Sequence, residues 1–122
     1  MKKAIFLAVC LAFVSSSAFA ATTLTMSLVK ANTGLTLYGD ADTATADTAL
    51  IGKTSTGVGL SMAVNAVGYA LITQHMQGTK AFASNYDSTS IKSMEVDTVG
   101  TVQEDVTDYT EDFAPGDGWT AL

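Results

Sequence analysis

The alternation of hydrophobic and polar residues is most regular between residues 57 and 76. Two runs with a period of two, Val58–Val64 and Tyr69–Met76, are separated by the sequence Ala66-Val67-Gly68. A period of two is typical of a β-strand, because successive side chains point to opposite faces of a sheet. The pattern therefore predicts a β-hairpin. A helical period of 3.6 fits less well, because each glycine in this stretch would cost a helix about 1 kcal/mol relative to alanine.

The two faces of this hairpin differ in the size of their side chains. One face of the first strand carries the larger apolar residues Val58, Leu60, Met62 and Val64, and the other carries Gly59, Ser61, Ala63 and Asn65. Small side chains on the second face indicate close packing against a neighbouring element. In the second strand, Tyr69, Leu71 and His75 share one face, and we mark these three residues as a candidate interface.

Weaker alternation on both sides of the hairpin predicts further strands. Residues 23–29 alternate around Leu24, Met26 and Leu28, a turn follows at residues 32–34, and Leu35–Tyr38 resumes the pattern, which predicts a first hairpin. Beyond the central hairpin, Lys80–Ser84 and Ile91–Val96 follow turns of their own. The expected fold is all-β, an antiparallel meander forming a small sandwich or roll.

The first twenty residues follow a different pattern, that of a secretory signal peptide. Lys2 and Lys3 precede an apolar run over residues 4–14, and Ala18-Phe19-Ala20 has the small side chains that a signal peptidase recognises. We expect a helical signal at residues 1–20, cleaved between Ala20 and Ala21. Its apolar run of about 11 residues is shorter than the roughly 20 that a membrane-spanning helix needs. The sequence therefore predicts an exported protein in the periplasm, at the cell surface or outside the cell, with no direct membrane anchor.

Cleavage would change the chemistry of the remaining domain, residues 21–122. It would remove Cys10, the single cysteine, so no disulfide could form. It would also remove Lys2 and Lys3, taking the net charge from −6 to −8 in a chain without arginine. A strongly acidic protein with four scattered lysines does not favour nucleic acid as a partner, because nucleic-acid binding needs clustered basic residues.

Negative charge is concentrated in a C-terminal segment that starts at about residue 95. From Glu95 to Asp117 there are eight carboxylates and no lysine, although Phe113 and Trp119 indicate that the segment packs against the domain. We expect a single β domain whose acidic segment presents one charged face.

Few residues suggest catalysis or metal binding. His75 is the only histidine, and no serine lies in a G-x-S-x-G nucleophile elbow. The sequence therefore predicts a protein that is not an enzyme, has no cofactor and has no catalytic residues. The best candidates for a metal site are weak calcium ligands, Asp40 and Asp42 in one segment and Asp105 and Asp108 in another, because calcium prefers carboxylate oxygens in loops.

Several short segments carry a resemblance to a known group of proteins. The segments are Ala49-Leu50-Ile51-Gly52-Lys53, Ser55-Thr56-Gly57-Val58, Gly68-Tyr69-Ala70, Thr73-Gln74-His75, Gly78-Thr79-Lys80-Ala81-Phe82, Tyr86-Asp87-Ser88-Thr89 and Gly118-Trp119-Thr120. In these segments the chain resembles small exported β proteins of metal-reducing bacteria. That group includes the globular, separately encoded subunit of split type IV pilins.

The resemblance implies a non-enzymatic structural subunit of an extracellular filament or cell-surface assembly. Its partner would be a short helical pilin that forms the filament core, or copies of the chain itself. Two other functions stay open at this point. One is a free periplasmic binding or pilin-chaperone-like module, and the other, with the least support, is a minor hydrolase.

Overall fold

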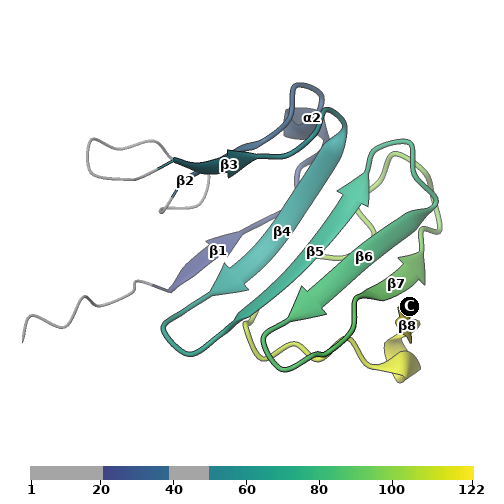
Figure 1. Cartoon of the computed structure of the whole chain (residues 1–122). Coiled ribbons are helices and arrows are strands. Elements are labelled where there is room, and N and C mark those ends of the chain that lie inside the picture. The colour runs from purple at the N-terminus through teal and green to yellow at the C-terminus, as the bar shows by residue number, and fades with distance from the viewer. Residues whose placement is uncertain (1–20, 39–49) are drawn as a thin grey trace, which may run out of the picture.

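The computed structural model describes residues 21–38 and 50–122, and it shows an all-β antiparallel fold. The proposed signal peptide with Ala20, and the calcium candidates Asp40 and Asp42, lie outside the described residues. The main sheet has six strands in the order β1-β4-β5-β6-β7-β8 (Figure 1). Their bounds are β1 Thr22–Leu24, β4 Val58–Val64, β5 Tyr69–His75, β6 Lys80–Asn85, β7 Lys92–Glu95 and β8 Thr120–Ala121.

The predicted meander forms the centre of this sheet. Strands β4 and β5 pair along their full length, from Val58 opposite His75 to Val64 opposite Tyr69, which confirms the predicted hairpin. Asn65 closes the turn, since its side-chain oxygen accepts hydrogen bonds from the backbone N–H groups of Val67 and Gly68. Strands β6 and β7 add to β5 in sequence order, as the turns between them predict.

The N-terminal hairpin predicted from residues 23–38 is wrong. Strand β1 ends at Leu24 and pairs with β4, and residues Leu28–Ala31 form a short helix, α2. Ser27 starts this helix because its hydroxyl oxygen accepts a hydrogen bond from the N–H of Lys30. Leu28 can approach the sheet closely because Gly59 has no side chain, and a Cβ there would lie 2.9 Å from Leu28 Cδ2.

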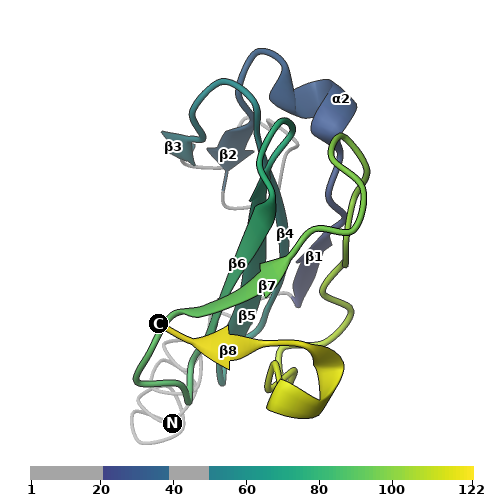
Figure 2. The same ribbon diagram turned by 90° about the vertical axis from the view of Figure 1, so that its right-hand side faces the viewer.

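The second half of the predicted hairpin has a different partner. Strand β2, Thr36–Tyr38, pairs with β3, Leu50–Lys53, in a separate two-stranded sheet. The register shifts between Leu37 and Tyr38, as in a β-bulge. Thr54 joins this small sheet to β4, because its hydroxyl donates to the carbonyl of Val58 and accepts from the N–H of Leu35. The strands therefore form a hairpin that stands apart from the main sheet (Figure 2).

One face of the main sheet is covered by the segment between β7 and β8. In place of the second sheet of a sandwich, this layer is an irregular chain with one short 3-10 turn, Pro115–Asp117 (Figure 2). The main hydrophobic core lies between the two layers. It contains Met26, Leu28, Ala63, Ala70, Ile72, Ala81, Ala83, Val96, Val106, Phe113 and Trp119.

Buried polar side chains of the sheet hold the irregular segment in place. Gln74 donates to the carbonyl of Thr101 and accepts from the N–H of Gln103. Ser61 accepts from the N–H of Val106 and donates to the carbonyl of Leu24. These side chains satisfy backbone groups that a layer without regular structure would otherwise leave unpaired.

Trp119 closes the layer just before β8. Its ring is buried and contacts Phe113 edge to face, with 5.1 Å between the ring centroids. Its indole N–H donates to the Glu104 carboxylate at 3.0 Å. The aromatic residues therefore anchor the acidic segment, as the sequence predicts.

Replacement of Trp119 by alanine tests this anchoring. We expect Trp119→Ala to lower the free energy of unfolding by about 3–5 kcal/mol, because it opens a cavity and removes the ring contact and the hydrogen bond to Glu104. Urea unfolding of the purified protein measures the change. As a matched control, Val29→Ala alters an apolar side chain that is 82% exposed and should change stability by less than about 0.5 kcal/mol. Equal losses in the two variants would contradict the anchoring role.

Candidate functional site: the open face of the sheet

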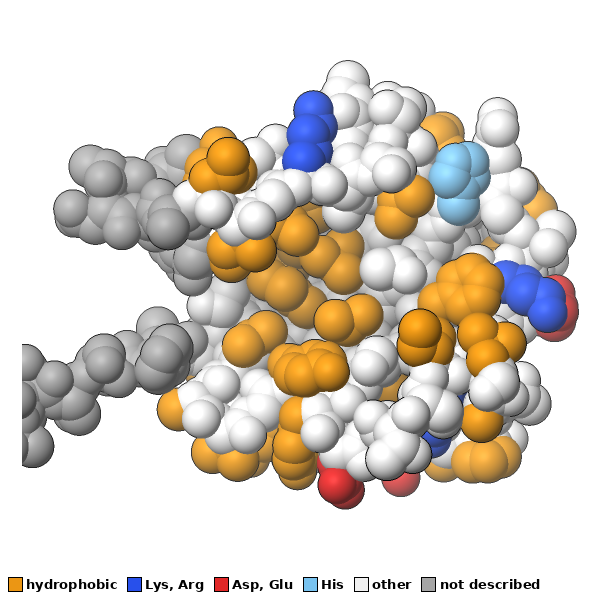
Figure 3. Space-filling model, viewed as in Figure 1, with side chains coloured by type: hydrophobic (Ala, Val, Ile, Leu, Met, Phe, Trp, Pro, Cys, Tyr) orange, Lys and Arg blue, Asp and Glu red, His pale blue; other side chains and the backbone are white. Residues whose placement is uncertain are grey.

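The second face of the main sheet, which we call the open face, points away from the irregular segment. Figure 3 shows this face with many hydrophobic side chains at its centre. The strand registers assign eleven side chains of β4, β5 and β6 to it. They are Val58, Leu60, Met62, Val64, Tyr69, Leu71, Thr73, His75, Lys80, Phe82 and Ser84.

The open face is unusually apolar for the uncovered face of an antiparallel sheet. Such a face normally carries polar side chains and leaves the apolar ones to the core. Here the large apolar side chains point outward, and Val64, Tyr69 and Phe82 are 36–39% exposed. The small side chains Ala70 and Ala81 point inward instead and are fully buried. An apolar surface of this kind is typical of an interaction site.

The β2–β3 hairpin covers one end of this face. It lies beside the upper part of β4 and above β1 in the view of Figure 1, and on the side opposite the irregular segment in Figure 2. Leu24 and Leu60 point to the same side as Met62, yet each is only 7% exposed. The hairpin therefore shields the β1 end of the face and leaves the β5–β6 end uncovered.

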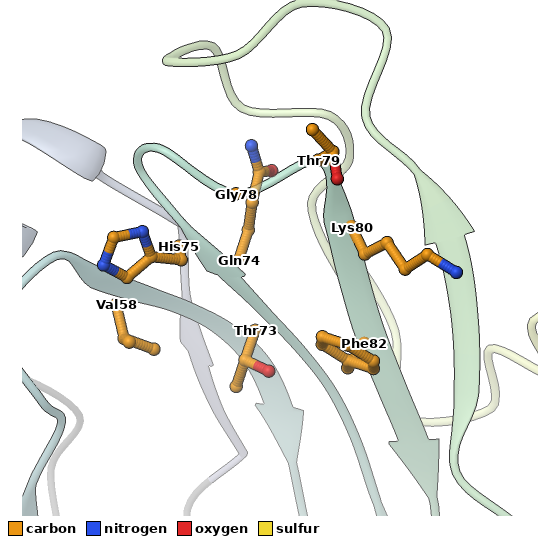
Figure 4. A pocket seen from close by; sticks show the side chains of 8 residues that line it. All are labelled: Val58, Thr73, Gln74, His75, Gly78, Thr79, Lys80 and Phe82. Carbon is orange, nitrogen blue, oxygen red and sulfur yellow. The ribbon is translucent and has the colours of Figure 1, made fainter. Parts of the chain in front are cut away.

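A shallow hollow of about 390 Å³ lies at this uncovered end, where β5 turns into β6. Figure 4 shows the side chains that line it, with Val58 and His75 on one side, Phe82 and Lys80 on the other, and Thr73 between them. The lining is mainly apolar, which suits an aliphatic or aromatic group better than a charged one.

His75 has a packing role at the edge of the hollow. Its Nδ1 accepts a hydrogen bond from the N–H of Gln77 at 3.1 Å. Its ring lies against Gly57, where a Cβ would come within 2.6 Å of Nε2 and where the backbone has a φ of +82°. Only glycine fits both the contact and this left-handed conformation without strain. These contacts orient the ring at the edge of the hollow.

The charges of the domain are separated by face. Every carboxylate of the described residues belongs to residue 87 or later. In Figure 3, acidic side chains are visible only at the margins of the open face. The carboxylate of Glu95 there lies 3.3 Å from Lys80 Nζ, and both side chains are well exposed. A surface pair of this kind adds about 0–1 kcal/mol and leaves the face nearly neutral.

The two described calcium candidates have structural hydrogen bonds. The Asp105 carboxylate accepts from the N–H of Met26 at 2.6 Å and so connects the irregular segment to the chain after β1. The Asp108 carboxylate accepts from the hydroxyl and the N–H of Thr110, which hold its pKa below the usual value. Within residues 21–38 and 50–122, no three histidine, cysteine or carboxylate side chains come together as a metal site would need.

Glu111 shows the opposite shift. Partial burial raises its pKa above the usual value, with smaller contributions from the nearby carboxylates of Glu104, Asp108 and Asp112. A hydrogen bond from the N–H of Thr107 acts in the other direction. The acidic segment thus contains one carboxylate that folding favours in the protonated form.

The structure brings together the three residues that the sequence marks as a candidate interface. Tyr69, Leu71 and His75 lie along β5 on the open face. Sequence reasoning missed Phe82, which stands directly opposite Thr73 on β6 and lines the hollow. The alternation within β6 could have placed Phe82 on one face, but only the pairing with β5 shows that this is the same face.

Comparison with known proteins leaves the site to be interpreted from its own geometry. The chain matches no protein-family model, and neither the curated proteins nor the solved structures contain a match to it. In the part of the chain that the structure describes, no helix has the length and hydrophobicity to span a bilayer.

Substitution of Asp105 tests its structural role. We expect Asp105→Ala to lower the free energy of unfolding by about 1–3 kcal/mol, because the partly buried N–H of Met26 loses its acceptor. Asp105→Asn keeps an oxygen acceptor at the same position and should recover most of this loss. Urea unfolding of both variants measures the difference, and equal destabilisation by alanine and asparagine would rule out the hydrogen bond as the cause.

The raised pKa of Glu111 predicts a pH dependence of stability. Near and above its usual pKa of 4.5, the folded chain binds more protons at this site than the unfolded chain, so the contribution of Glu111 to stability falls as the pH rises. Glu111→Gln should therefore melt at a higher temperature than the wild type at pH 7 and at nearly the same temperature well below the usual pKa.

Asp108→Asn is a control of opposite sign. The pKa of Asp108 is lowered by folding, so the stability it contributes is present above its usual pKa of 3.8 and is lost as the pH falls. This variant should melt below the wild type at pH 7. Thermal melting of both variants and the wild type between pH 3 and 8 measures these differences. A difference in melting temperature from the wild type that is the same at every pH would contradict the pKa shifts of Glu111 and Asp108.

Proposed function

We propose that this protein is a non-enzymatic, exported structural subunit of an extracellular filament or cell-surface assembly. The observation that carries the proposal is the open face, where large apolar side chains stand on the uncovered side of a well-packed sheet. In this role the open face binds a protein partner, and the acidic irregular segment faces outward.

The distribution of charge supports this orientation. Asp97, Glu104, Asp108, Glu111 and Asp112 belong to the irregular segment, which lies on the side of the sheet away from the open face (Figure 2). Burial of unpaired carboxylates in an interface is costly, whereas an apolar face gains free energy when it leaves water. An assembly that buries the open face and exposes the acidic side satisfies both conditions.

The partner is either a short helical pilin, as the resemblance implies, or another copy of the chain. An elongated apolar helix and a second apolar sheet face both match the hydrophobic character of the open face. The proposed signal peptide would deliver the domain to the compartment in which such an assembly forms. Its apolar helix is discarded in this proposal, so the domain attaches through its β surfaces.

The hollow beside Phe82 favours a second candidate function, a free periplasmic binding or pilin-chaperone-like module. A concave apolar site of about 390 Å³ could receive a side chain or a small apolar ligand. In this case the protein would stay soluble in the periplasm and would bind its partner only for a time.

Cell fractionation combined with a variant of the open face distinguishes these functions. We expect the wild-type chain in the sheared surface fraction, and we expect Leu71→Lys to reduce that fraction about tenfold or more, because a charge at the centre of the buried face weakens association by at least 1.4 kcal/mol. Immunoblots of sheared material and periplasm measure the distribution.

Val29→Lys is the matched control, because Val29 is exposed on helix α2 and lies outside the open face. It should behave as the wild type. Confinement of the wild-type chain to the soluble periplasm would contradict the assembly function and favour the binding module.

A further inference from the structure

A second hollow, which we call the polar hollow, lies where β6 turns into β7. Its volume is about 300 Å³, at the lower end of the range of small-molecule sites. The hollow beside Phe82 is mainly apolar, whereas this one has only polar residues in its lining. They are Asn85, Asp87, Ser88, Thr89, Lys92 and Asp112. The polar hollow therefore offers a ligand hydrogen bonds and charges.

Hydrogen bonds within the protein fix the walls of the polar hollow. The ammonium group of Lys92 donates to the backbone carbonyls of Asp112 and Phe113, at 2.8 and 3.0 Å, and so ties the irregular segment to β7. The hydroxyl of Ser88 donates to the carbonyl of Ser90 and accepts from its N–H. Because these groups are already held in place, a ligand pays little for ordering them.

Asn85 contributes a buried hydrogen-bond acceptor that has no partner. The residue is 6% exposed, and its side-chain nitrogen donates to the carbonyl of Glu111 at 2.7 Å. Its Oδ1 atom is buried and accepts no hydrogen bond from the described residues. Leaving a buried acceptor unpaired is costly. A ligand that donates a hydrogen bond to this oxygen from the hollow removes the cost.

The exposed residues of the polar hollow add further hydrogen-bonding groups. Asp87, Thr89 and Asp112 are exposed, and within residues 21–38 and 50–122 no hydrogen bond or ion pair engages their side chains. A carboxylate accepts hydrogen bonds, a hydroxyl both donates and accepts them, and an ammonium group has three N–H donors. Lys92 uses two of its three donors on backbone carbonyls. The hollow thus presents acceptors and donors together.

The charges of the polar hollow favour a neutral ligand. The carboxylates of Asp87 and Asp112 repel an anion, and the ammonium of Lys92 repels a cation. A neutral ligand must donate to the carboxylates and to Asn85 Oδ1, and must accept from the lysine. Hydroxyl groups do both. We propose that the polar hollow binds a hydroxyl-rich ligand, a sugar unit, through these four side chains.

The polar hollow lies on the side of the sheet that the proposed assembly leaves exposed. Lys92 stands opposite Ala83, whose buried side chain belongs to the core beneath the irregular segment, and Asp112 is part of that segment. A sugar bound there does not compete with a partner on the open face. The inference is therefore independent of the proposed function. A free saccharide and a unit of a glycan chain present the same hydroxyl groups to the site.

An NMR titration of the purified, isotopically labelled protein tests the site. The sugar probes are glucose, galactose, mannose and N-acetylglucosamine, and the charged probes are inorganic phosphate and calcium chloride. Each is added up to about 50 mM, and we expect at least one sugar to bind with a dissociation constant of about 1–10 mM. Neither charged probe should bind as tightly. The amide signals of residues 85–92 and 111–113 should move most.

Single substitutions measure the contribution of each carboxylate. Asp87→Ala and Asp112→Ala should each weaken sugar binding about tenfold, because each removes a charge-assisted hydrogen bond to a hydroxyl group. Both side chains are exposed, so these variants should remain folded. The matched control is Asp117→Ala, which removes an exposed carboxylate of the same segment outside the polar hollow. It should leave the dissociation constant unchanged.

Several outcomes would overturn the inference. They are the absence of binding by every sugar, tighter binding of phosphate or calcium, signals that move mainly around Phe82, and equal effects of Asp112→Ala and Asp117→Ala. Maltotriose and chitotriose distinguish the two sources of the sugar, since binding at least tenfold tighter than that of the monosaccharide indicates a glycan chain and a smaller gain indicates a free sugar. Leu71→Lys, which tests the assembly function, should leave sugar binding unchanged, so either proposal can fail alone.

Discussion

The fold depends on hydrogen bonds between buried side chains of the sheet and the backbone of the irregular segment. A chain without regular structure cannot pair its own N–H and C=O groups, and burying them unpaired is costly. Ser61, Gln74 and Asn85 supply the missing partners at three positions along the segment, from Thr101 to Glu111. Each of these side chains is at least nine-tenths buried. This layer in turn provides the aromatic residues that complete the core.

The same constraint explains why the larger side chains point outward. Trp119 and Phe113 enter the core from the irregular segment and pack in the same hydrophobic cluster as the inner side chains of the sheet. At several positions the strands beneath them contribute small residues, among them Gly59, Ala63 and Ala70, while Ile72 is a large apolar side chain of β5 on this face. Since side chains alternate along a strand, the apolar residues of β4 and β5 then lie on the opposite face. The open face is therefore a consequence of how the core is built.

The sequence predicts the regular part of this structure well. The period of two between residues 58 and 76 is undisturbed, so it predicts the β4–β5 hairpin and the face that holds Tyr69, Leu71 and His75, whereas the register comes from the structure. It fails before residue 38, because Leu28 also fits a helical turn, and the cap at Ser27 together with the space at Gly59 decides between the two. The pairing of β1 with β4 and of β2 with β3 joins residues far apart in sequence, which local patterns do not encode. The place of Phe82 beside the hollow depends on the register between β5 and β6, which the alternation within each strand does not give.

Several carboxylates of the acidic segment have a structural role in the irregular layer. Asp105 accepts from the N–H of Met26, Glu104 from the indole of Trp119, and Asp108 from Thr110, so each carboxylate stabilises the layer that covers the core. A carboxylate used in this way must stay near the segment it supports, and this keeps negative charge away from the opposite side of the sheet. The open face can then be apolar and nearly neutral in a strongly acidic protein. The irregular layer therefore accounts both for the position of the carboxylates and for the apolar side chains on the open face. The proposed docking surface follows from the way this chain completes its core.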